Sequence, residues 1–271
     1  MASEAWDFDR SLSGYAWRTP NARANVLLTH GFAEYAERYV ARYHQLVPKL
    51  NALGFDVYGW DMRGHGRSAG ARGVADLRGA VADHRAARRA LAGKPLFLFG
   101  HSLGGLVTAA SVAENASDVR GVVLSSPALL ITAPTHLRAI AGAVSVFAPS
   151  ARLVPPLEAE GLSRIAEEVE AYRSDPMVSD PRVPAKTGAT AIDVAERAWT
   201  QYPNWTTPVL VLHGEKDRAT DPEGSKRFVP MIKAPDKTLV LYPEGRHELL
   251  NDLDRDAAMD VISHWLTQRA A

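Results

Sequence analysis

Residues 96–110 read LFLFGHSLGGLVTAA, and this stretch decides the fold. A short apolar run leads into Gly100-His101-Ser102-Leu103-Gly104, and a helical pattern follows, from residue 103 to residue 114. Short apolar runs of this kind are typical of strands that are buried on both faces. Glycines on both sides of Ser102 allow the tight, strained turn at which a strand passes into a helix around a nucleophilic serine. The stretch therefore predicts a catalytic serine at the end of a buried strand.

Two competing interpretations of this pattern have to be weighed. A second G-x-S-x-G copy is Gly66-Arg67-Ser68-Ala69-Gly70, but it lies in a glycine- and arginine-rich loop with no apolar run on either side. Ser102 could also be a simple N-cap of the helix that follows. The N-cap interpretation explains the serine but leaves the flanking glycines unexplained, so we expect Ser102 to be the nucleophile.

The rest of the sequence alternates between short apolar runs and helical patterns. Strands are predicted at 25–29, 56–60, 95–99, 120–124, 208–212 and 238–242, and the more polar stretch 6–19 is expected to hold one or two leading edge strands. Helices are predicted at 39–53, 75–91, 103–114, 222–232 and 254–270. Such alternation predicts an α/β fold with a mostly parallel central sheet and helices on both faces.

The alternation stops between residues 131 and 203, which are rich in alanine and proline and have no convincing strand. Helical spacing joins Leu137, Ile140, Ala141, Val144 and Phe147, and a second helix is expected near 162–173. We interpret 131–203 as a helical cap inserted between two parts of one core, 1–130 and 204–271. The apolar helix either acts as a lid that lines an acyl pocket or rests on lipid, or packs inward on the core.

A serine nucleophile needs a base and an acid that orients the base. In a sheet of this kind both are expected in loops after late strands, with the acid first. Asp217 lies in the middle of the loop after strand 208–212. Its competitors are Glu215, close to the strand end, and Asp221, which precedes a proline as an N-cap does. His247 follows strand 238–242, whereas His264 lies inside the last predicted helix. We expect Asp217 and His247 to complete the triad.

Two backbone N–H groups are needed to bind the oxyanion that develops during acyl transfer. One is expected from Leu103, directly after the nucleophile and at the N-terminus of a helix whose dipole favours negative charge. The other is expected from Phe32, because His30-Gly31-Phe32 follows the first central strand and Gly31 permits a close approach of the backbone. A plain turn would also explain His30-Gly31.

Composition excludes several classes of function. The 271 residues contain 31 Lys and Arg and 31 Asp and Glu, so no basic surplus favours nucleic acid as a partner. The absence of cysteine excludes disulfides and thiolate chemistry. The histidines lack metal-ligand spacing, so no metal or cofactor is expected. No run of about 18 apolar residues and no signal-like start occur, which predicts a cytoplasmic protein, with possible peripheral membrane contact through the cap.

Five motifs together resemble the serine hydrolases of the α/β-hydrolase fold, specifically the monoacylglycerol lipase and lysophospholipase family and above all its bacterial monoacylglycerol lipases. They lie at residues 30–39, 61–68, 100–105, 212–217 and 242–247, and the cap segments 171–176 and 182–184 add to the likeness. The family often has histidine where Tyr35 stands and methionine where Leu103 stands. By this resemblance the loop around Arg63-Gly-His-Gly66 is a structural support.

The resemblance implies hydrolysis of a monoacylglycerol to fatty acid and glycerol through an acyl-enzyme on Ser102. It places Tyr172 near the glycerol moiety, and Glu34 and Arg38 beside the oxyanion loop as its support. The alternatives are another esterase or a lysophospholipase of the same fold, or a hydrolase-fold binding protein with slow turnover, since the triad does not choose its acyl substrate. The sequence makes no prediction of the oligomeric state.

Overall fold

The computed structural model describes residues 2–132, 135–152 and 154–270. Within these residues, eight strands form one sheet in the order β1-β2-β4-β3-β5-β6-β7-β8. The strands are β1 (Glu4–Ala5), β2 (Gly14–Trp17), β3 (Ala24–Thr29), β4 (Phe55–Trp60), β5 (Leu96–His101), β6 (Val119–Ser125), β7 (Val209–Gly214) and β8 (Lys237–Tyr242). Only the β1–β2 and β2–β4 pairs are antiparallel. The carboxyl ends of the parallel strands β3–β8 therefore meet at one edge, where an α/β sheet presents its ligand site.

All six predicted strands are confirmed as β3 to β8, and the predicted fold class is confirmed with them. The polar stretch 6–19 contains β2, whereas β1 lies just before it. The central strands read as apolar runs because helices cover both faces of the sheet.

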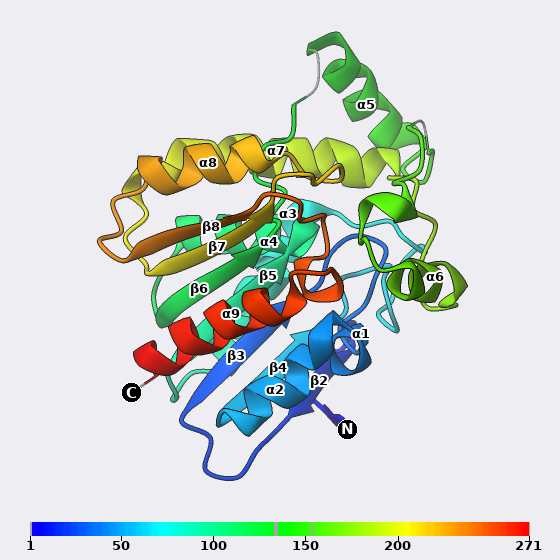
Figure 1. Cartoon of the computed structure of the whole chain (residues 1–271). Helices are drawn as coiled ribbons and strands as arrows, with labels where there is room; N and C mark the ends of the chain where they lie inside the picture. Colours follow the sequence, from blue (N-terminus) through cyan, green and yellow to red (C-terminus); the bar gives the residue numbers. More distant parts are fainter. Residues whose placement is uncertain (1, 133–134, 153, 271) are drawn as a thin grey trace.

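Helices pack on the two faces of the sheet around two hydrophobic clusters (Figure 1). One face is covered by α3 (Leu77–Ala90), α4 (Ser102–Glu114), α7 (Ala185–Gln201) and α8 (Pro222–Met231). The other is covered by α1 (Arg38–Ala41), α2 (Leu46–Ala52) and α9 (Arg255–Arg269). The remaining helices are α5 (Thr135–Phe147) and α6 (Ala166–Ser174), and short 3-10 turns lie at 43–45, 159–161, 202–204 and 249–251.

The helix predicted over 39–53 is interrupted, which corrects the sequence interpretation. Tyr43, His44 and Gln45 have φ of 51°, 53° and 55°, a conformation that ends α1 and separates it from α2. The side chain of Asn251 accepts the Tyr43 N–H, and the Tyr43 ring stacks on Tyr39 at 3.9 Å between centroids. These contacts outside the helix compensate for the strained backbone, and local periodicity could not indicate them.

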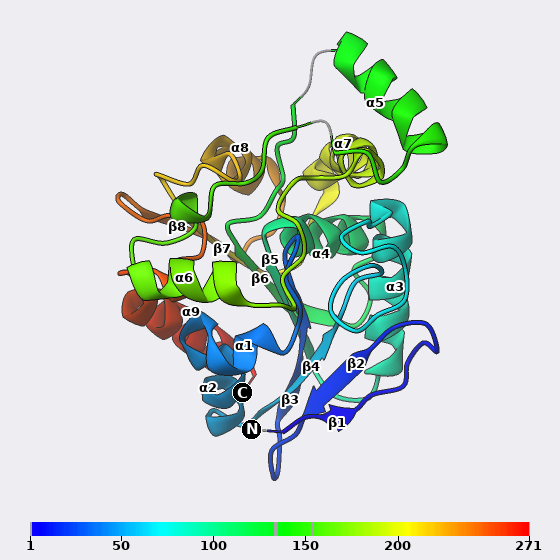
Figure 2. The same cartoon turned by 90° about the vertical axis from the view of Figure 1, so that its right-hand side faces the viewer.

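The segment between β6 and β7 holds α5, α6 and α7. Helix α7, which the sequence did not predict as a separate element, packs on α3 and α4 through Ala191, Val194 and Ala195 in the main core cluster. In both views α5 lies at the outer side of the molecule beyond α7 (Figures 1 and 2), and it contacts α7, where Arg138 pairs with Glu196. The predicted apolar residues 137, 140 and 141 lie outside the described side chains. Phe147, which the helical spacing also included, is 89% exposed.

Candidate active site

Ser102 stands at a sharp turn between β5 and α4, with φ of +54°. Glycine is required at two nearby positions because two loops approach each other here. A Cβ on Gly104 would lie 2.2 Å from the carbonyl oxygen of His30, and one on Gly31 would lie 3.1 Å from the Ser102 Cβ. The turn after β5 therefore packs directly against the loop after β3, as a nucleophile elbow beside an oxyanion loop requires.

The structure brings together the three side chains that the sequence predicted as a triad. His247 Nε2 lies 2.9 Å from Ser102 Oγ, and His247 Nδ1 lies 2.8 Å from Asp217 Oδ2. The residues come from the loops after β5, β7 and β8, which all end at the same edge of the sheet. A nucleophile, a base and an orienting acid within hydrogen-bond distance form the geometry of serine acyl transfer.

The two alternative acids and the alternative histidine contact other residues and do not join the three side chains just described. The Asp221 carboxylate accepts the Glu223 N–H, so the predicted N-cap of α8 is confirmed. Glu215 contacts Lys226 at 3.3 Å. His264 is exposed on α9.

The serine of the second G-x-S-x-G copy has a structural environment. The Ser68 hydroxyl donates to the Asp61 carbonyl at 2.6 Å and accepts the Ser13 N–H at 2.8 Å. It thus connects the loop after β4 to the segment before β2.

Burial and charge set the protonation of the three interacting side chains. Burial alone would raise the pKa of Asp217, but the charge and hydrogen bonds of His247 and His213 hold it well below the usual range. Burial alone would lower the pKa of His247, yet the Asp217 carboxylate raises it above 6.5. The His101 ring packs against His247 with 4.8 Å between ring centroids and 47° between the ring planes, and burial lowers the pKa of His101 to about 4. Asp217 is therefore ionised, and His101 is neutral at pH 7.

The structure adds residues around Asp217 to which sequence reasoning gave no role. His213 Nε2 lies 3.2 Å from Asp217 Oδ2, and the Thr220 hydroxyl donates to the same oxygen at 2.8 Å. The N–H groups of Ala219 and Thr220 donate to Oδ1. His213 belongs to a motif that carried the family resemblance, so its presence was visible in the sequence. Its contact with Asp217 depends on how the loop folds back on β7.

The two residues expected to form the oxyanion hole line one pocket together with Ser102. Phe32 and Leu103 both lie at its edge, and Leu103 is at the N-terminal end of α4. Within the described residues, neither N–H donates to a protein acceptor. Both groups are therefore available to an oxygen atom bound beside Ser102 Oγ.

A buried ionic cluster lies behind the oxyanion loop. Glu34 Oε1 accepts the Gly31 N–H at 2.6 Å. The Arg38 guanidinium lies between two carboxylates, 3.2 Å from Glu34 and 2.8 Å from Glu248. The Tyr172 ring faces the same guanidinium at 5.2 Å. This arrangement connects the loop after β3, the residue after His247 and α6 of the predicted cap. Glu248 is a member that sequence reasoning missed, although it is adjacent to His247.

Replacing Arg38 by leucine is expected to destabilise the protein by about 3–5 kcal/mol, since removal of one partner leaves two buried carboxylates without a counter-charge. Its side chain is 2% exposed. The free energy of unfolding in urea measures the effect. Arg67→Leu is the matched control, because Arg67 pairs with Glu37 at the surface and such pairs contribute only about 0–1 kcal/mol. Equal stability of the two variants would contradict the role given to the cluster.

The segment 159–164 lies along the loop that carries His247. The Glu248 N–H donates to the Leu162 carbonyl at 2.8 Å, and the Ser163 hydroxyl donates to the Asn251 carbonyl at 2.6 Å. Arg164 forms an ion pair with the fully buried Asp252 at 2.9 Å. This part of the predicted cap is therefore bonded to the core.

A second set of bonds connects the predicted cap to the oxyanion loop. The Ser179 N–H donates to the Ala33 carbonyl at 2.8 Å, and the Tyr35 hydroxyl donates to Asp175 Oδ2 at 2.8 Å. Tyr35 is the position at which the sequence departs from the family pattern, and here it joins the loop to the end of α6.

A cavity of about 570 Å³ opens at Ser102 and is lined mainly by apolar side chains from the segment after β6, from α7 and from the Asp217 loop. These include Leu130, Ile131, Val183 and Ile192. A much smaller space, about 20 Å³, also touches Ser102, and its lining combines apolar side chains such as Leu162 with the polar side chains of Glu34, Tyr172 and Glu248. Ser102 therefore borders both a large apolar cavity and a space of about the size of one water molecule.

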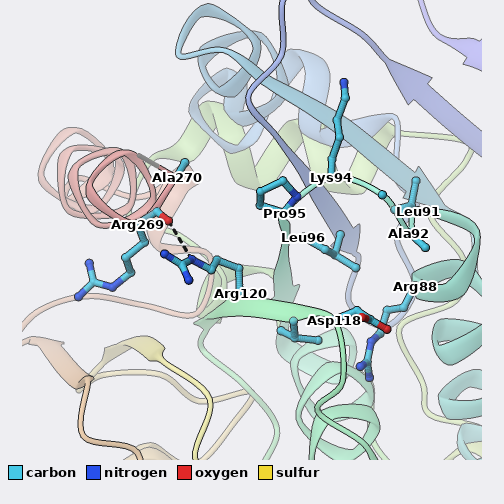
Figure 3. Close-up of a pocket in the computed structure, with 12 residues that line it drawn as sticks. Arg88, Leu91, Ala92, Lys94, Pro95, Leu96, Asp118, Arg120, Arg269 and Ala270 are labelled. Carbon is cyan, nitrogen blue, oxygen red and sulfur yellow. Dashed lines mark hydrogen bonds between the residues drawn. The ribbon is translucent and has the colours of Figure 1, made fainter.

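A different pocket of about 410 Å³ lies at the opposite edge of the sheet and holds none of the predicted site residues (Figure 3). Several of its charged groups are engaged elsewhere: Lys94 with Asp56, and Arg269 with Asp236. Arg88 donates to backbone carbonyls at the end of α4. These contacts indicate that the basic residues of this pocket have a structural role.

Residues 2–132, 135–152 and 154–270 contain no group of histidine and acidic side chains arranged to hold a metal ion. The same residues contain no helix that is long and apolar enough to cross a membrane.

The parallel sheet, the serine at a strand-to-helix turn and the late histidine define an α/β-hydrolase of the serine type. Comparison with known families agrees: residues 20–254 match the hydrolase family described as serine aminopeptidase, S33. The chain belongs to this family, and the resemblance seen in the motifs is confirmed.

Several similar proteins are named as lipases. The monoacylglycerol lipase of Mycolicibacterium smegmatis is 34% identical over 252 residues, which cover 90% of this chain and 88% of that protein. The human monoglyceride lipase is 30% identical over 266 residues, covering 94% and 86%. The crystal structure of Paleococcus ferrophilus monoacylglycerol lipase superposes with a TM-score of 0.86 at 35% identity, covering 95% of this chain and 99% of that one.

Proposed function

We propose that the protein is a monoacylglycerol lipase, which hydrolyses a single-chain acyl ester to a fatty acid and glycerol through an acyl-enzyme on Ser102. The observation that carries this proposal is the hydrogen-bonded series Ser102–His247–Asp217 at the mouth of a large apolar cavity. The relatives named monoacylglycerol and monoglyceride lipase support the same substrate class.

The proposed reaction proceeds in two steps. His247 Nε2 takes the Ser102 proton while the serine oxygen attacks the ester carbonyl, and His247 then gives that proton to the departing glycerol oxygen. Water, deprotonated by His247, next attacks the acyl-enzyme and releases the fatty acid. Asp217 keeps Nδ1–H directed away from the reaction and stabilises the imidazolium. The N–H groups of Phe32 and Leu103 bind the oxyanion in both steps.

The large cavity beside Ser102 fits the acyl part of a monoacylglycerol. The apolar cavity of about 570 Å³ is large enough for an extended acyl chain, whose burial is favourable by about 0.8 kcal/mol per methylene group. The space beside Glu34, Tyr172 and Glu248 is about 20 Å³, so it has room for one hydroxyl group of glycerol and not for the whole head group. Arg38 acts there indirectly, because it fixes the two carboxylates and the Tyr172 ring.

We also propose that residues 131–203 form a cap on the core formed by 1–130 and 204–271, and that α5 brings the enzyme to a lipid surface. Val146 and Phe147 at the end of α5 are exposed, and Val154 follows them. Apolar side chains on a projecting helix favour partition into the boundary of a lipid phase. The bonded segment 159–164 stays with the core in this proposal.

Substrate profiles test the proposed function. Monoacylglycerols of medium and long chain are expected to give the highest kcat/KM among monoacylglycerols, triacylglycerols, lysophospholipids and p-nitrophenyl esters. Preference for lysophospholipids would assign a different head group, and preference for acetyl esters would contradict a lipid substrate. Binding without turnover would indicate a hydrolase-fold binding protein.

The pH dependence of kcat/KM is expected to have an acid limb above pH 6.5. Activity needs neutral His247, whose pKa the Asp217 carboxylate raises above 6.5, so activity is lost as the pH falls through that value. Initial rates on a water-soluble ester between pH 5 and 9 measure this. A limb well below pH 6 would contradict the His247–Asp217 pairing.

A further inference from the structure

Besides the residues of the proposed mechanism, the site contains a second buried histidine that contacts Asp217. His213 lies at the end of β7 and is fully buried. Its Nε2 is 3.2 Å from Asp217 Oδ2, the same oxygen that lies 2.8 Å from His247 Nδ1. Two imidazole rings thus share one carboxylate oxygen.

The surroundings of His213 fix which of its nitrogens carries the proton. Nε2 faces a carboxylate, so it must carry a hydrogen, because a lone pair there would face the negative oxygen. Nδ1 lies 2.7 Å from the Ser225 hydroxyl on α8, which donates to it when the ring is neutral. Thr220 Oγ1 accepts the Nε2–H at 3.2 Å, and the Thr220 hydroxyl donates to Asp217 Oδ2 at 2.8 Å, so Thr220 connects the ring to the carboxylate in addition to their direct 3.2 Å contact.

We infer that His213 is a positioning residue for the reaction, which acts through Asp217 and sets how strongly that carboxylate raises the basicity of His247. This inference rests on the proposed function. Each N–H that the carboxylate accepts withdraws part of its charge from the His247 contact. With His213 present, Asp217 stays ionised and oriented, but it raises the basicity of His247 less than it would without His213.

Other charged groups lie around the His247 ring, and replacing His213 leaves these groups unchanged. The His101 ring packs against His247 at a tilt of 47°, and the charges of Glu34 and Glu248, which pair with Arg38, also act on His247. A change caused by His213 is therefore a shift relative to this constant background.

The test compares His213→Phe, which removes the donor, with His213→Gln, whose side-chain amide can reach Asp217. His84→Phe is the matched control, because His84 is also fully buried and bonded to a serine, Ser111, at 2.8 Å, but on the α3–α4 contact. Activity is measured from pH 5 to 9 on a medium-chain p-nitrophenyl ester, together with thermal unfolding.

His213→Phe is expected to lower kcat/KM roughly 10–100-fold and to move the acid limb to higher pH by about 0.5 unit or more. His213→Gln is expected to restore most of the activity and the position of the limb. His84→Phe should lower thermal stability and leave the limb where it is. If His213→Phe folds and the acid limb of its pH profile does not shift, the inference is overturned, because a purely structural residue would affect stability alone.

If His213→Phe does not fold, His213→Leu decides, because this smaller apolar side chain also removes the N–H that faces Asp217. A shift of the limb toward higher pH supports the inference, and an unchanged limb overturns it. Failure of the proposed function is seen separately, in the wild type: no hydrolysis of the p-nitrophenyl ester contradicts the triad, and hydrolysis of that ester without hydrolysis of monoacylglycerols contradicts only the substrate.

Discussion

Replacement of Ser102 by alanine is expected to reduce kcat for ester hydrolysis by roughly 10⁴–10⁶. The variant lacks the oxygen that forms the acyl-enzyme, and His247 then has no nucleophile to deprotonate at 2.9 Å. What remains comes from substrate binding and from the N–H groups of Phe32 and Leu103. Single-turnover and steady-state rates on a soluble ester measure the loss. The fold should be unaffected, because alanine is the smaller residue at a turn that glycine neighbours already define.

The matched control is Ser68→Ala, since Ser68 lies in the second G-x-S-x-G copy. Its hydroxyl bonds the loop after β4 to the segment before β2, so we expect a loss of stability of about 1 kcal/mol and nearly unchanged kcat. A large loss of kcat with Ser68→Ala and a small one with Ser102→Ala would reverse the assignment of the nucleophile.

Asp217→Asn is expected to reduce kcat by roughly 10⁴. The amide keeps the size of the carboxylate but can present N–H₂ to His247, which favours the tautomer with its proton on Nε2. That tautomer cannot accept the Ser102 proton, and the imidazolium formed later loses its counter-charge. Rates and the pH profile of the variant measure the effect.

Asp221→Asn provides the control in the same loop. Asp221 caps α8 by accepting the Glu223 N–H, and asparagine is an equally good N-cap residue. Its kcat should therefore stay within about twofold of the wild type, since its carboxylate does not contact His247. Strong impairment by Asp221→Asn together with a mild effect of Asp217→Asn would move the acid to position 221.

The sequence predicted the strands and the site residues that depend on local patterns. Apolar runs marked β3, β4, β5 and β7 because these strands are buried on both faces. The apolar runs of β6 and β8 were also recognised, although β8 is only partly buried. Ser102, Asp217 and His247 could be selected because the ends of parallel strands meet at one edge, so that residues distant in sequence become neighbours. The N-cap at Asp221 followed from its place before Pro222.

Other features depend on contacts that no local pattern encodes. Two contacts fix the break at residues 43–45. Asn251, which lies 208 residues further along the chain, accepts the Tyr43 N–H, and the Tyr43 ring stacks on Tyr39. Helix α7 has an amphipathic pattern and packs on α3 and α4, but it lies inside the segment 131–203 that the sequence interpretation assigned to a cap, so it was not predicted as a separate element.

The roles of Glu248 and His213 also become apparent only when separate loops meet. Arg38 brings Glu248 beside Glu34, and Asp217 brings His213 beside His247. A glutamate at position 248 or a histidine at position 213 does not indicate, from the sequence alone, which residue it contacts.

Labelling with a fluorophosphonate, followed by mass-spectrometric mapping of the modified peptide, tests the central claim most directly. The probe reacts only with a serine whose hydroxyl is deprotonated by a neighbouring base. Rapid modification of Ser102 in the wild type, and its loss in His247→Ala, is the predicted result. An unmodified Ser102, or modification that persists without His247, would contradict the account.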